Sequence, residues 1–501
     1  MNIKEAKAEV KKNVEINLEK DVNGEYLIPV VRQRPIFLVG APGIGKTAIM
    51  EQVAADLGIA LVSYSMTHHT RQSAIGLPFL KEVTYGDKTY TKSEYTMSEI
   101  IASVYDVIQK TGKKEGILFL DEINCVSETL APAMLLFLQY KRFGNQSIPE
   151  GWVVVTAGNP PQYNKSVKEF DVATMDRLKV ITVDASFSVW KEYAYNAGVH
   201  PAILAFLELN EKFFYSIKTN VDGKEYVTAR GWEDLSTEIQ AYERHGFPVT
   251  QELVSEYITN KEAARKFTVY YDLFRKYRVN YAIGDILSGS ATSAAAAKAK
   301  GAKYEERLSI ISMLMESLGS GAKGVMTEFH ALQDVVKKLR VIKKAAAKGA
   351  STYELLANRI ADIRAEMQNA KEANALSMEN KDIWSREIAL MESYKTQLEE
   401  LPTEDQFKAV KTAFSKAATA LDRKQKKTDT AMTNAFKFIE DAWGGDSQEM
   451  TLFVTELTLN RQAAAFINTY GNEEYYNHNS TMLIYDESQK LDDEINELLG
   501  I

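Results

Sequence analysis

Short apolar runs alternate with longer segments of helical periodicity between residue 36 and about residue 185. The apolar runs are rich in β-branched residues and cover residues 36–39, 60–64, 117–120, 152–156 and 180–183. Runs of this length without polar alternation are typical of strands that are buried on both faces. Because helical segments separate them, we predict a doubly wound, five-stranded parallel sheet.

Two polar stretches that contain aromatic and basic residues interrupt this alternation. In residues 76–97, a Gly86-Asp87 turn separates two short segments, which predicts a hairpin. Residues 140–149 predict a second hairpin or an exposed loop. Each stretch could contact a partner or could be ordinary solvent-exposed decoration.

The remainder of the chain has mostly helical periodicity. Residues 1–24 predict a short amphipathic helix followed by a turn, and residues 25–185 contain the predicted sheet. Residues 186–290 predict a helical domain with strand character only at 216–227, and small residues at 285–297 suggest a linker.

The last predicted domain, residues 300–501, is all-helical. Gly and Pro are absent from residues 350–401, and apolar residues there follow a 4-3-4-3 spacing that breaks near 371–381. This pattern predicts a long helical hairpin or coiled coil, although a plain helical bundle that packs on its own domain fits it equally well.

Composition and charge limit the class of protein. The chain of 501 residues, 45% hydrophobic and 26% charged, is long enough for two to four domains. Its net charge of −8 argues against a surface that coats DNA but leaves room for a local basic groove. A single cysteine, Cys125, rules out internal disulfides, and we see neither a signal sequence nor an apolar run of transmembrane length. We therefore expect a cytoplasmic protein without a membrane partner.

A phosphate-binding loop follows the first apolar run. The sequence Gly40-Ala41-Pro42-Gly43-Ile44-Gly45-Lys46-Thr47 has the pattern G-x-x-x-x-G-K-T and precedes a helical segment. Glycines let successive backbone N–H groups turn toward phosphate oxygens, the lysine reaches the β- and γ-phosphates, and the threonine hydroxyl binds Mg²⁺. We assign all eight residues to nucleotide binding and Thr47 also to the metal.

Two carboxylates follow the third apolar run, about 75 residues after the loop. A buried strand would deliver Asp121 to the Mg²⁺, which prefers oxygen ligands. The adjacent Glu122 would then be the base that deprotonates the attacking water.

Two further side chains are candidates for the catalytic site. Asn159 follows the next strand, where its amide can hydrogen-bond the γ-phosphate or the water without adding charge. Arg177 precedes the last strand, and it could stabilise transition-state charge on a neighbouring subunit or form a helix-end salt bridge.

Together, the loop at 40–47, the Leu-Asp-Glu-Ile-Asn segment at 120–124, the Asn159-Pro160 pair and the segment ending Asp176-Arg177-Leu178 resemble the MoxR family of AAA+ ATPases. The chain departs from that family at Cys125, where Arg is frequent, and at Leu178, where Phe is frequent.

The resemblance covers residues 25–290 and implies an αβα core with inserts at the two interruptions and a helical lid. It implies that Asn159 is sensor 1, that Arg177 is the arginine finger and that Arg230, in the lid, is sensor 2. Residues 300–501 resemble no family that we can name.

These observations predict an enzyme that hydrolyses ATP with Mg²⁺ and couples hydrolysis to remodelling or assembly of another protein, as a chaperone does. The resemblance implies a ring homo-oligomer, in particular a hexamer, and a separate partner with a von Willebrand factor A domain. No guanine-reading N-K-x-D segment is evident, which favours ATP over GTP.

Two alternatives use the same core. One is a nucleic-acid motor or loader, which would need Lys88, Lys141 and Arg142 aligned along a channel. We do not expect nucleic acid as the partner, because the basic segment at 337–348 lacks interleaved aromatic residues. The other is a nucleotide-switched scaffold whose helical region binds a partner.

Overall fold

A computed structural model of the chain describes residues 1–163, 167–220, 223–290 and 293–479. It divides into two compact units, one formed by residues 1–189 with 361–381 and the other by 190–360 with 382–501. The predicted domain that ends at residue 501 therefore extends past the described residues. The division into domains at 24, 185 and 290 stays a prediction.

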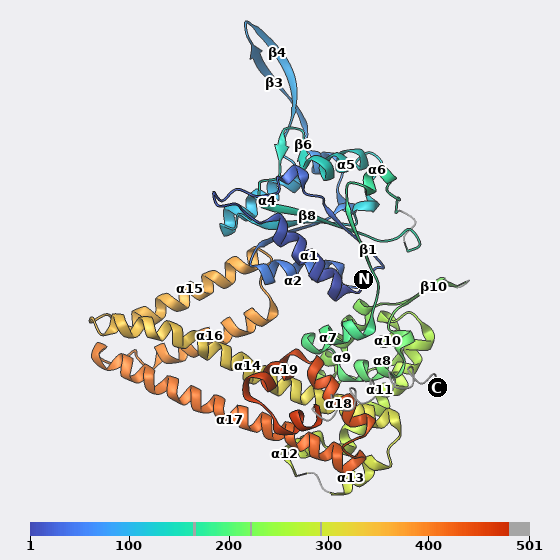
Figure 1. Ribbon diagram of the computed structural model, residues 1–501, viewed down its shortest axis with the longest axis vertical. Helices are drawn as coiled ribbons and strands as arrows, with labels where there is room; N and C mark the ends of the chain where they lie inside the picture. The colour runs from blue at the N-terminus through green and yellow to red at the C-terminus, as the bar shows by residue number, and fades with distance from the viewer. Residues whose placement is uncertain (164–166, 221–222, 291–292, 480–501) are drawn as a thin grey trace, which may run out of the picture. The chain divides into compact units, whose positions relative to one another are not determined.

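The first unit contains a five-stranded sheet in the order β2-β5-β8-β1-β9 (Figure 1). All neighbouring strands run parallel, which confirms the predicted fold class. Its strands are β1 (Ile36–Gly40), β2 (Ala60–Ser65), β5 (Gly116–Asp121), β8 (Trp152–Gly158) and β9 (Lys179–Val183). Its helices are α1 (Ile3–Asn17), α2 (Lys46–Leu57), α3 (Arg71–Ile75), α4 (Glu99–Thr111), α5 (Ala131–Tyr140) and α6 (Val172–Met175), with short 3₁₀ turns at Val30–Arg32, Met66–His68 and Ile123–Cys125.

The burial pattern explains why these segments are strands and helices. The central strands β5 and β8 are buried almost throughout, as expected for strands covered on both faces. Helix α4 has a polar cap, because Ser98 accepts a hydrogen bond from the Ile101 N–H, and it ends at Gly112 in the left-handed conformation.

Both predicted interruptions form hairpins. The strands β3 (Pro78–Tyr85) and β4 (Lys88–Tyr95) pair around the Gly86-Asp87 turn and project from the sheet (Figure 1). The strands β6 (Arg142–Phe143) and β7 (Gln146–Ser147) form a much shorter hairpin. The Gln146 side chain joins the two, since it accepts a hydrogen bond from the Ser98 N–H at 2.9 Å and donates one to the Tyr95 carbonyl at 3.2 Å.

One of the three basic side chains that a nucleic-acid motor would need along its channel is buried. That alternative requires Lys141 to line the channel with Lys88 and Arg142, but the Lys141 side chain is buried, with only 2% of the residue exposed. Its Nζ donates to the carbonyl of Leu138, which belongs to the last turn of α5, so the amine hydrogen-bonds within the fold and does not face a partner. Lys88 and Arg142 are exposed.

The second unit is almost entirely helical. Its first part contains α7 (Phe187–Ala197), α8 (Pro201–Leu209), a 3₁₀ turn at Glu211–Phe213, the hairpin of β10 (Ser216–Asn220) and β11 (Gly223–Val227), α9 (Ala229–His245), α10 (Gln251–Tyr257) and α11 (Lys261–Tyr281). Aromatic side chains from several of these helices form a buried cluster around Phe206, Trp232 and Phe267.

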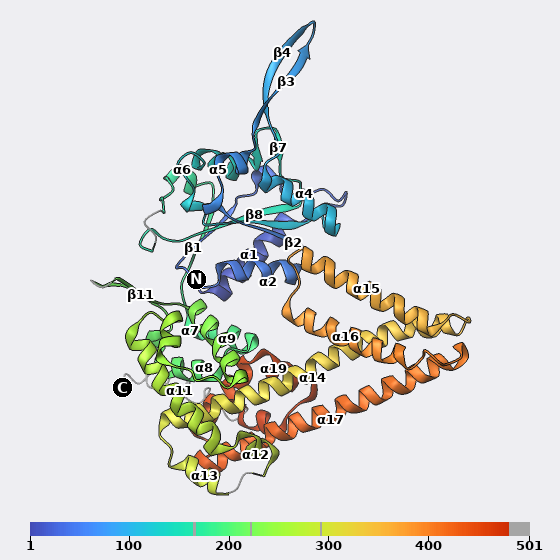
Figure 2. The same ribbon diagram turned by 180° about the vertical axis from the view of Figure 1, so that it is seen from behind.

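The later helices are α12 (Ile283–Ser288), α13 (Ser293–Lys300), α14 (Tyr304–Ala346), α15 (Thr352–Glu372), α16 (Met378–Thr396), α17 (Thr403–Trp443), α18 (Gln448–Leu459) and α19 (Arg461–Tyr470). The long helices α14 and α17 lie side by side in both views (Figures 1 and 2). The helices α15 and α16 are joined by a turn at residues 373–377, which lies inside the predicted break. The helical hairpin or coiled coil stays a prediction.

Most of the described residues in the predicted linker at 285–297 are helical and belong to α12 or α13, while Gly289 and Ser290 lie outside both helices. The linker stays a prediction. Alanine is the strongest helix former, and these helices also have tertiary contacts. The indole of Trp443 donates to the Ala299 carbonyl at 2.8 Å, and the amide of Asn434 donates to the Leu287 carbonyl at 3.0 Å. None of the helices in the described part of the chain has the length and hydropathy needed to cross a membrane.

Candidate nucleotide-binding site

The glycine-rich loop lies between β1 and α2, as its sequence predicts. Gly43 and Gly45 have φ values of 74° and 97°, a left-handed backbone that favours glycine. At Gly40 the reason is space, because a Cβ there would lie 2.6 Å from the Val183 carbonyl oxygen. The same Cβ would lie 2.8 Å from Cδ1 of Ile44, a buried side chain of the loop. The loop therefore packs closely against Val183 at the end of β9.

Lys46 is the first residue of α2, and its ammonium is buried within the loop. Nζ donates to the carbonyls of Gly40 and Ala41, each at 2.8 Å, and to Asn159 Oδ1 at 3.0 Å. Asn159 follows β8, the strand adjacent to β1. The structure therefore brings together the loop lysine and the predicted sensor amide.

Thr47 and Asp121 lie together at the same edge of the sheet. The Thr47 hydroxyl donates to Asp121 Oδ2 at 2.9 Å, and Asp121 Oδ1 accepts the Glu122 N–H at 2.9 Å. A hydroxyl and a carboxylate are the hard oxygen donors that Mg²⁺ prefers. These two residues therefore fit the predicted metal site.

Glu122 follows the last residue of β5 and has a φ of 55°, which is uncommon outside glycine. Its Oε2 accepts hydrogen bonds from Ser65 Oγ at 3.0 Å and from Thr67 Oγ1 at 3.1 Å. Ser65 ends β2, which pairs with β5, so adjacent strands place these side chains together. Neither hydroxyl was predicted from the sequence, although polar residues that follow an apolar run were a usable signal.

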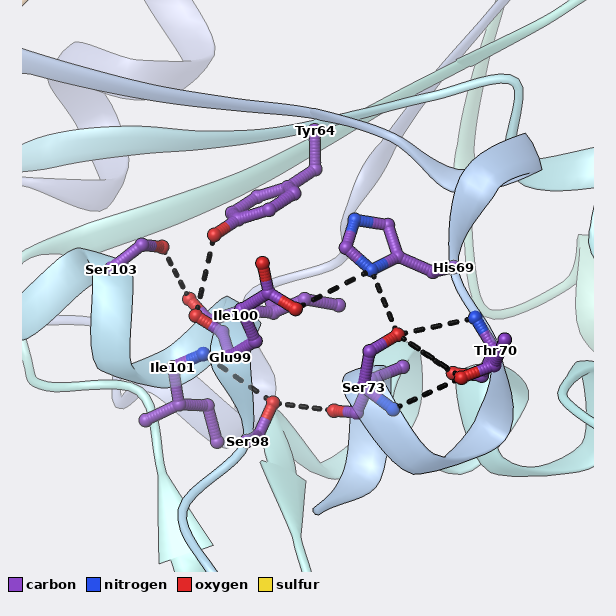
Figure 3. Close-up of polar contacts among 10 residues, drawn as sticks. Tyr64, His69, Thr70, Ser73, Ser98, Glu99, Ile100, Ile101 and Ser103 are labelled. Carbon is purple, nitrogen blue, oxygen red and sulfur yellow. Dashed lines mark hydrogen bonds and ion pairs between the residues drawn. The ribbon is translucent and has the colours of Figure 1, made fainter.

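A second polar cluster joins the end of β2 and the segment after it to α3 and α4 (Figure 3). His69 Nδ1 lies 3.2 Å from Ser73 Oγ, and its ring packs against Tyr64 with the ring centroids 5.0 Å apart. The Tyr64 hydroxyl donates to the Glu99 carbonyl at 3.3 Å, and burial raises the pKa of this phenol. The cluster fixes the segment that connects β2 to the β3–β4 hairpin.

Asn124 positions the residue that follows β8. Its Nδ2 donates to the Asn159 carbonyl at 2.8 Å, and its side chain is packed so closely that a Cβ at Gly158 would lie 2.4 Å from Asn124 Oδ1. This role of Asn124 was not predicted from the sequence, where the residue stood out only as part of the segment at 120–124.

The two arginines lie outside this arrangement. Arg177 follows α6 and is exposed, and its side chain makes no hydrogen bond or ion pair with any residue that the structure describes. Arg230 is exposed in the first turn of α9, which belongs to the other compact unit. Their roles as arginine finger and sensor 2 stay predictions.

The sheet order, the glycine-rich loop and the paired carboxylates define a P-loop nucleotide-binding domain. Residues 35–178 match the model of the AAA domain family, in its dynein-related subfamily. No curated protein matches the chain.

Among solved structures, the chain is similar to a point mutant of RuvB from Thermotoga maritima. The identity is 13%, the TM-score is 0.28, and the match covers 51% of this chain and 69% of the other.

Proposed function

We propose that this protein is a Mg²⁺-dependent ATP hydrolase of the MoxR type that uses hydrolysis to remodel or assemble a partner protein. The observation that carries the proposal is that Lys46, Thr47, Asp121, Glu122 and Asn159 occupy one edge of the sheet, where hydrogen bonds of 3.0 Å and 2.9 Å join Lys46 to Asn159 and Thr47 to Asp121. Each of these residue types matches a step of phosphoryl transfer to water.

Binding of the triphosphate would use the backbone N–H groups of the loop and the Lys46 ammonium. Lys46 is already held in place by two carbonyls and by Asn159, so its charge is preorganised for the phosphates. Thr47 and Asp121 would hold Mg²⁺, which neutralises charge on the phosphate oxygens when it is bound.

Hydrolysis would proceed by attack of a water on the γ-phosphorus, with ADP as the leaving group. Glu122 accepts the proton of this water. The hydroxyls of Ser65 and Thr67 bind Oε2 of Glu122 and so orient the carboxylate. Oε1, which accepts no hydrogen bond from the residues described, would bind the water. The Asn159 amide would hydrogen-bond the γ-phosphate or the water without adding charge.

Coupling to a partner is the part of the proposal that rests on resemblance. MoxR relatives form rings, commonly hexamers, and act with proteins that contain a von Willebrand factor A domain. The exposed Arg177 is free to reach a neighbouring subunit's nucleotide, which supports a ring. Arg230 would then act on the nucleotide of its own subunit.

Steady-state hydrolysis of ATP tests the proposal. We expect the wild type to hydrolyse ATP only with Mg²⁺, the Glu122→Gln variant to bind ATP without turnover, and the Lys46→Ala variant to lose binding. Glu150→Gln is the matched control, because Glu150 is exposed and its side chain makes no hydrogen bond or ion pair in the described part of the chain. Full activity of Glu122→Gln would refute the role of this carboxylate as the base.

A further inference from the structure

Strand β2 forms one edge of the five-stranded sheet, so one side of its backbone has no partner strand. Leu61 in this strand is almost completely buried, with 2% of the residue exposed, so water cannot satisfy its backbone groups. Another part of the chain does so instead. The Leu61 N–H donates to the Ala373 carbonyl at 2.9 Å, and the Leu61 carbonyl accepts from Asn374 Nδ2 at 3.3 Å.

Ala373 and Asn374 belong to the turn between α15 and α16, and Asn374 lies 313 residues after Leu61. The last carbonyls of a helix have no partner within that helix. At the end of α15, the Ala373 carbonyl finds its partner in the edge strand. Asn374 has a φ of 49°, a left-handed conformation that asparagine tolerates better than most residues and that ends the helix there.

Apolar contacts reinforce these two hydrogen bonds. Ala373 is fully buried and Ala375 is 7% exposed, and both belong to the core cluster that contains Ala60, Val62 and Ile101. The two alanines therefore anchor the turn in the core of the first unit, in agreement with the assignment of residues 361–381 to that unit, while Asn374 between them is exposed.

The same strand holds a side chain that contacts the proposed catalytic base. Ser65, four residues after Leu61, ends β2 and donates to Glu122 Oε2 at 3.0 Å. A strand advances about 3.3 Å per residue, so the turn and the base contact one short strand at points roughly 13 Å apart. A shift of β2 would move the Ser65 hydroxyl relative to Glu122.

We propose that the α15–α16 turn is a positioning element for Glu122, and that it acts through β2 and Ser65. The inference rests on the proposed role of Glu122 in ATP hydrolysis. The turn between α15 and α16 thereby gains a function, because it holds the edge strand of the sheet in place. A substitution that weakens the contact between the turn and β2 should slow hydrolysis. It should leave nucleotide binding unchanged, because binding depends on residues 40–47.

Substitutions in the turn of the full-length protein test this inference. Ala373→Asp places a carboxylate in the core cluster and should lower kcat about tenfold, while KM and the dissociation constant of a fluorescent ATP analogue change less than about twofold. Asn374→Asp keeps the size of the side chain but cannot donate to Leu61, and it should lower kcat about threefold. The matched controls Ala365→Asp and Asn369→Asp lie on exposed positions of α15 and should behave like the wild type.

A double-mutant cycle separates this route from general destabilisation. Ser65→Ala should lower kcat, and the Ser65→Ala/Ala373→Asp double variant should be no slower than the slower single variant, because both changes break one pathway. If Ala373→Asp does not fold, the cycle is built with Asn374→Asp. Additive losses in kcat, or a loss seen only in KM, would overturn the inference.

The same measurements distinguish failure of this inference from failure of the proposed function. Hydrolysis that needs Glu122 but is unchanged in Ala373→Asp and Asn374→Asp overturns the role of the turn alone. A wild type that does not hydrolyse ATP overturns both.

Discussion

Thr47 and Asp121 are 74 residues apart in sequence, yet the Thr47 hydroxyl donates to Asp121 Oδ2 at 2.9 Å. The first residue of the pair belongs to the first turn of α2 and the second ends β5. Because Asp121 Oδ1 also accepts the Glu122 N–H, two hydrogen bonds fix the orientation of this carboxylate. The predicted metal ligands are thus preorganised by the sheet.

The first prediction concerns Asp121. Asp121→Asn removes the negative charge that would hold Mg²⁺, so we expect kcat to fall about 100-fold and the Mg²⁺ concentration for half-maximal activity to rise. Titration of ATPase activity with MgCl₂ measures both. The control is Asp106→Asn, at an exposed position of α4. An unchanged Mg²⁺ dependence in Asp121→Asn would remove Asp121 from the metal site.

The second prediction concerns the close packing of Gly158 and Asn124. Gly158→Ala should lower both the melting temperature and kcat, since the new Cβ would lie 2.4 Å from Asn124 Oδ1 and displace the side chain that holds Asn159. Asn124→Ala makes room for the methyl group, so the double variant should be more stable than the sum of the single effects predicts. Thermal unfolding of the four proteins checks this, and strict additivity would contradict it.

The site residues that could be predicted from the sequence are those that belong to short local motifs. The loop at 40–47 requires glycine for backbone conformation and a lysine at the start of a helix, and both requirements appear as fixed spacings in the chain. Asp121, Glu122 and Asn159 each follow an apolar run, and parallel strands bring their carboxyl ends to one edge.

The rest of the site depends on which strands are neighbours and on contacts between distant segments. Ser65 and Thr67 contact Glu122 because β2 pairs with β5. The sequence of a single strand does not determine which strands become its neighbours. The contact of Ala373 with Leu61 joins residues that no local pattern relates. The burial of Lys141 could not be predicted from the sequence for another reason, because lysine side chains are rarely buried.

The third prediction concerns stability in acid through Glu243 in α9. His200, whose Nε2 lies 3.4 Å from Glu243 Oε1, lowers the pKa of this carboxyl from 4.5 to about 2, with smaller contributions from the Tyr271 hydroxyl and Arg278. A carboxyl with a lowered pKa in the folded state stabilises the protein above pH 4.5 and loses that contribution as the pH falls toward 2.

We therefore expect Glu243→Gln to melt a few degrees below the wild type at pH 6, and the difference to shrink as the pH is lowered to about 3. Thermal unfolding across this range measures it. Glu238→Gln, on the same helix, is the control. A difference between Glu243→Gln and the wild type that stays constant with pH would contradict the assignment.

The fourth prediction concerns Lys141, where burial lowers the pKa of the amine from 10.5 to about 7. Between these two values the unfolded chain binds a proton that the folded chain does not, so the free energy of unfolding should rise with pH above about pH 7. Lys141→Met keeps a similar shape without the charge, so it should melt higher than the wild type at about pH 6.5 and show a flatter dependence up to about pH 9. Lys110→Met, at an exposed position, should reproduce the wild-type slope.

The fifth prediction concerns Arg177 and the sharing of a site between subunits. If the exposed Arg177 completes the site of a neighbouring subunit, Arg177→Ala lacks a finger and Glu122→Gln lacks a base, so each alone should be inactive. A mixture of the two should recover activity, because some interfaces then combine an intact Glu122 with an intact Arg177. For the same reason, the specific activity of the wild type should rise with protein concentration.

The mixing experiment also separates this model from a monomeric enzyme. Arg34→Ala is the control, because Arg34 is exposed in the same unit and should leave activity unchanged, alone or mixed with Glu122→Gln at the corresponding dilution. A specific activity that is independent of concentration, with a fully active Arg177→Ala variant, would mean that each chain contains a complete site. Arg177 would then be an ordinary surface residue, and the ring would have to be argued from other contacts.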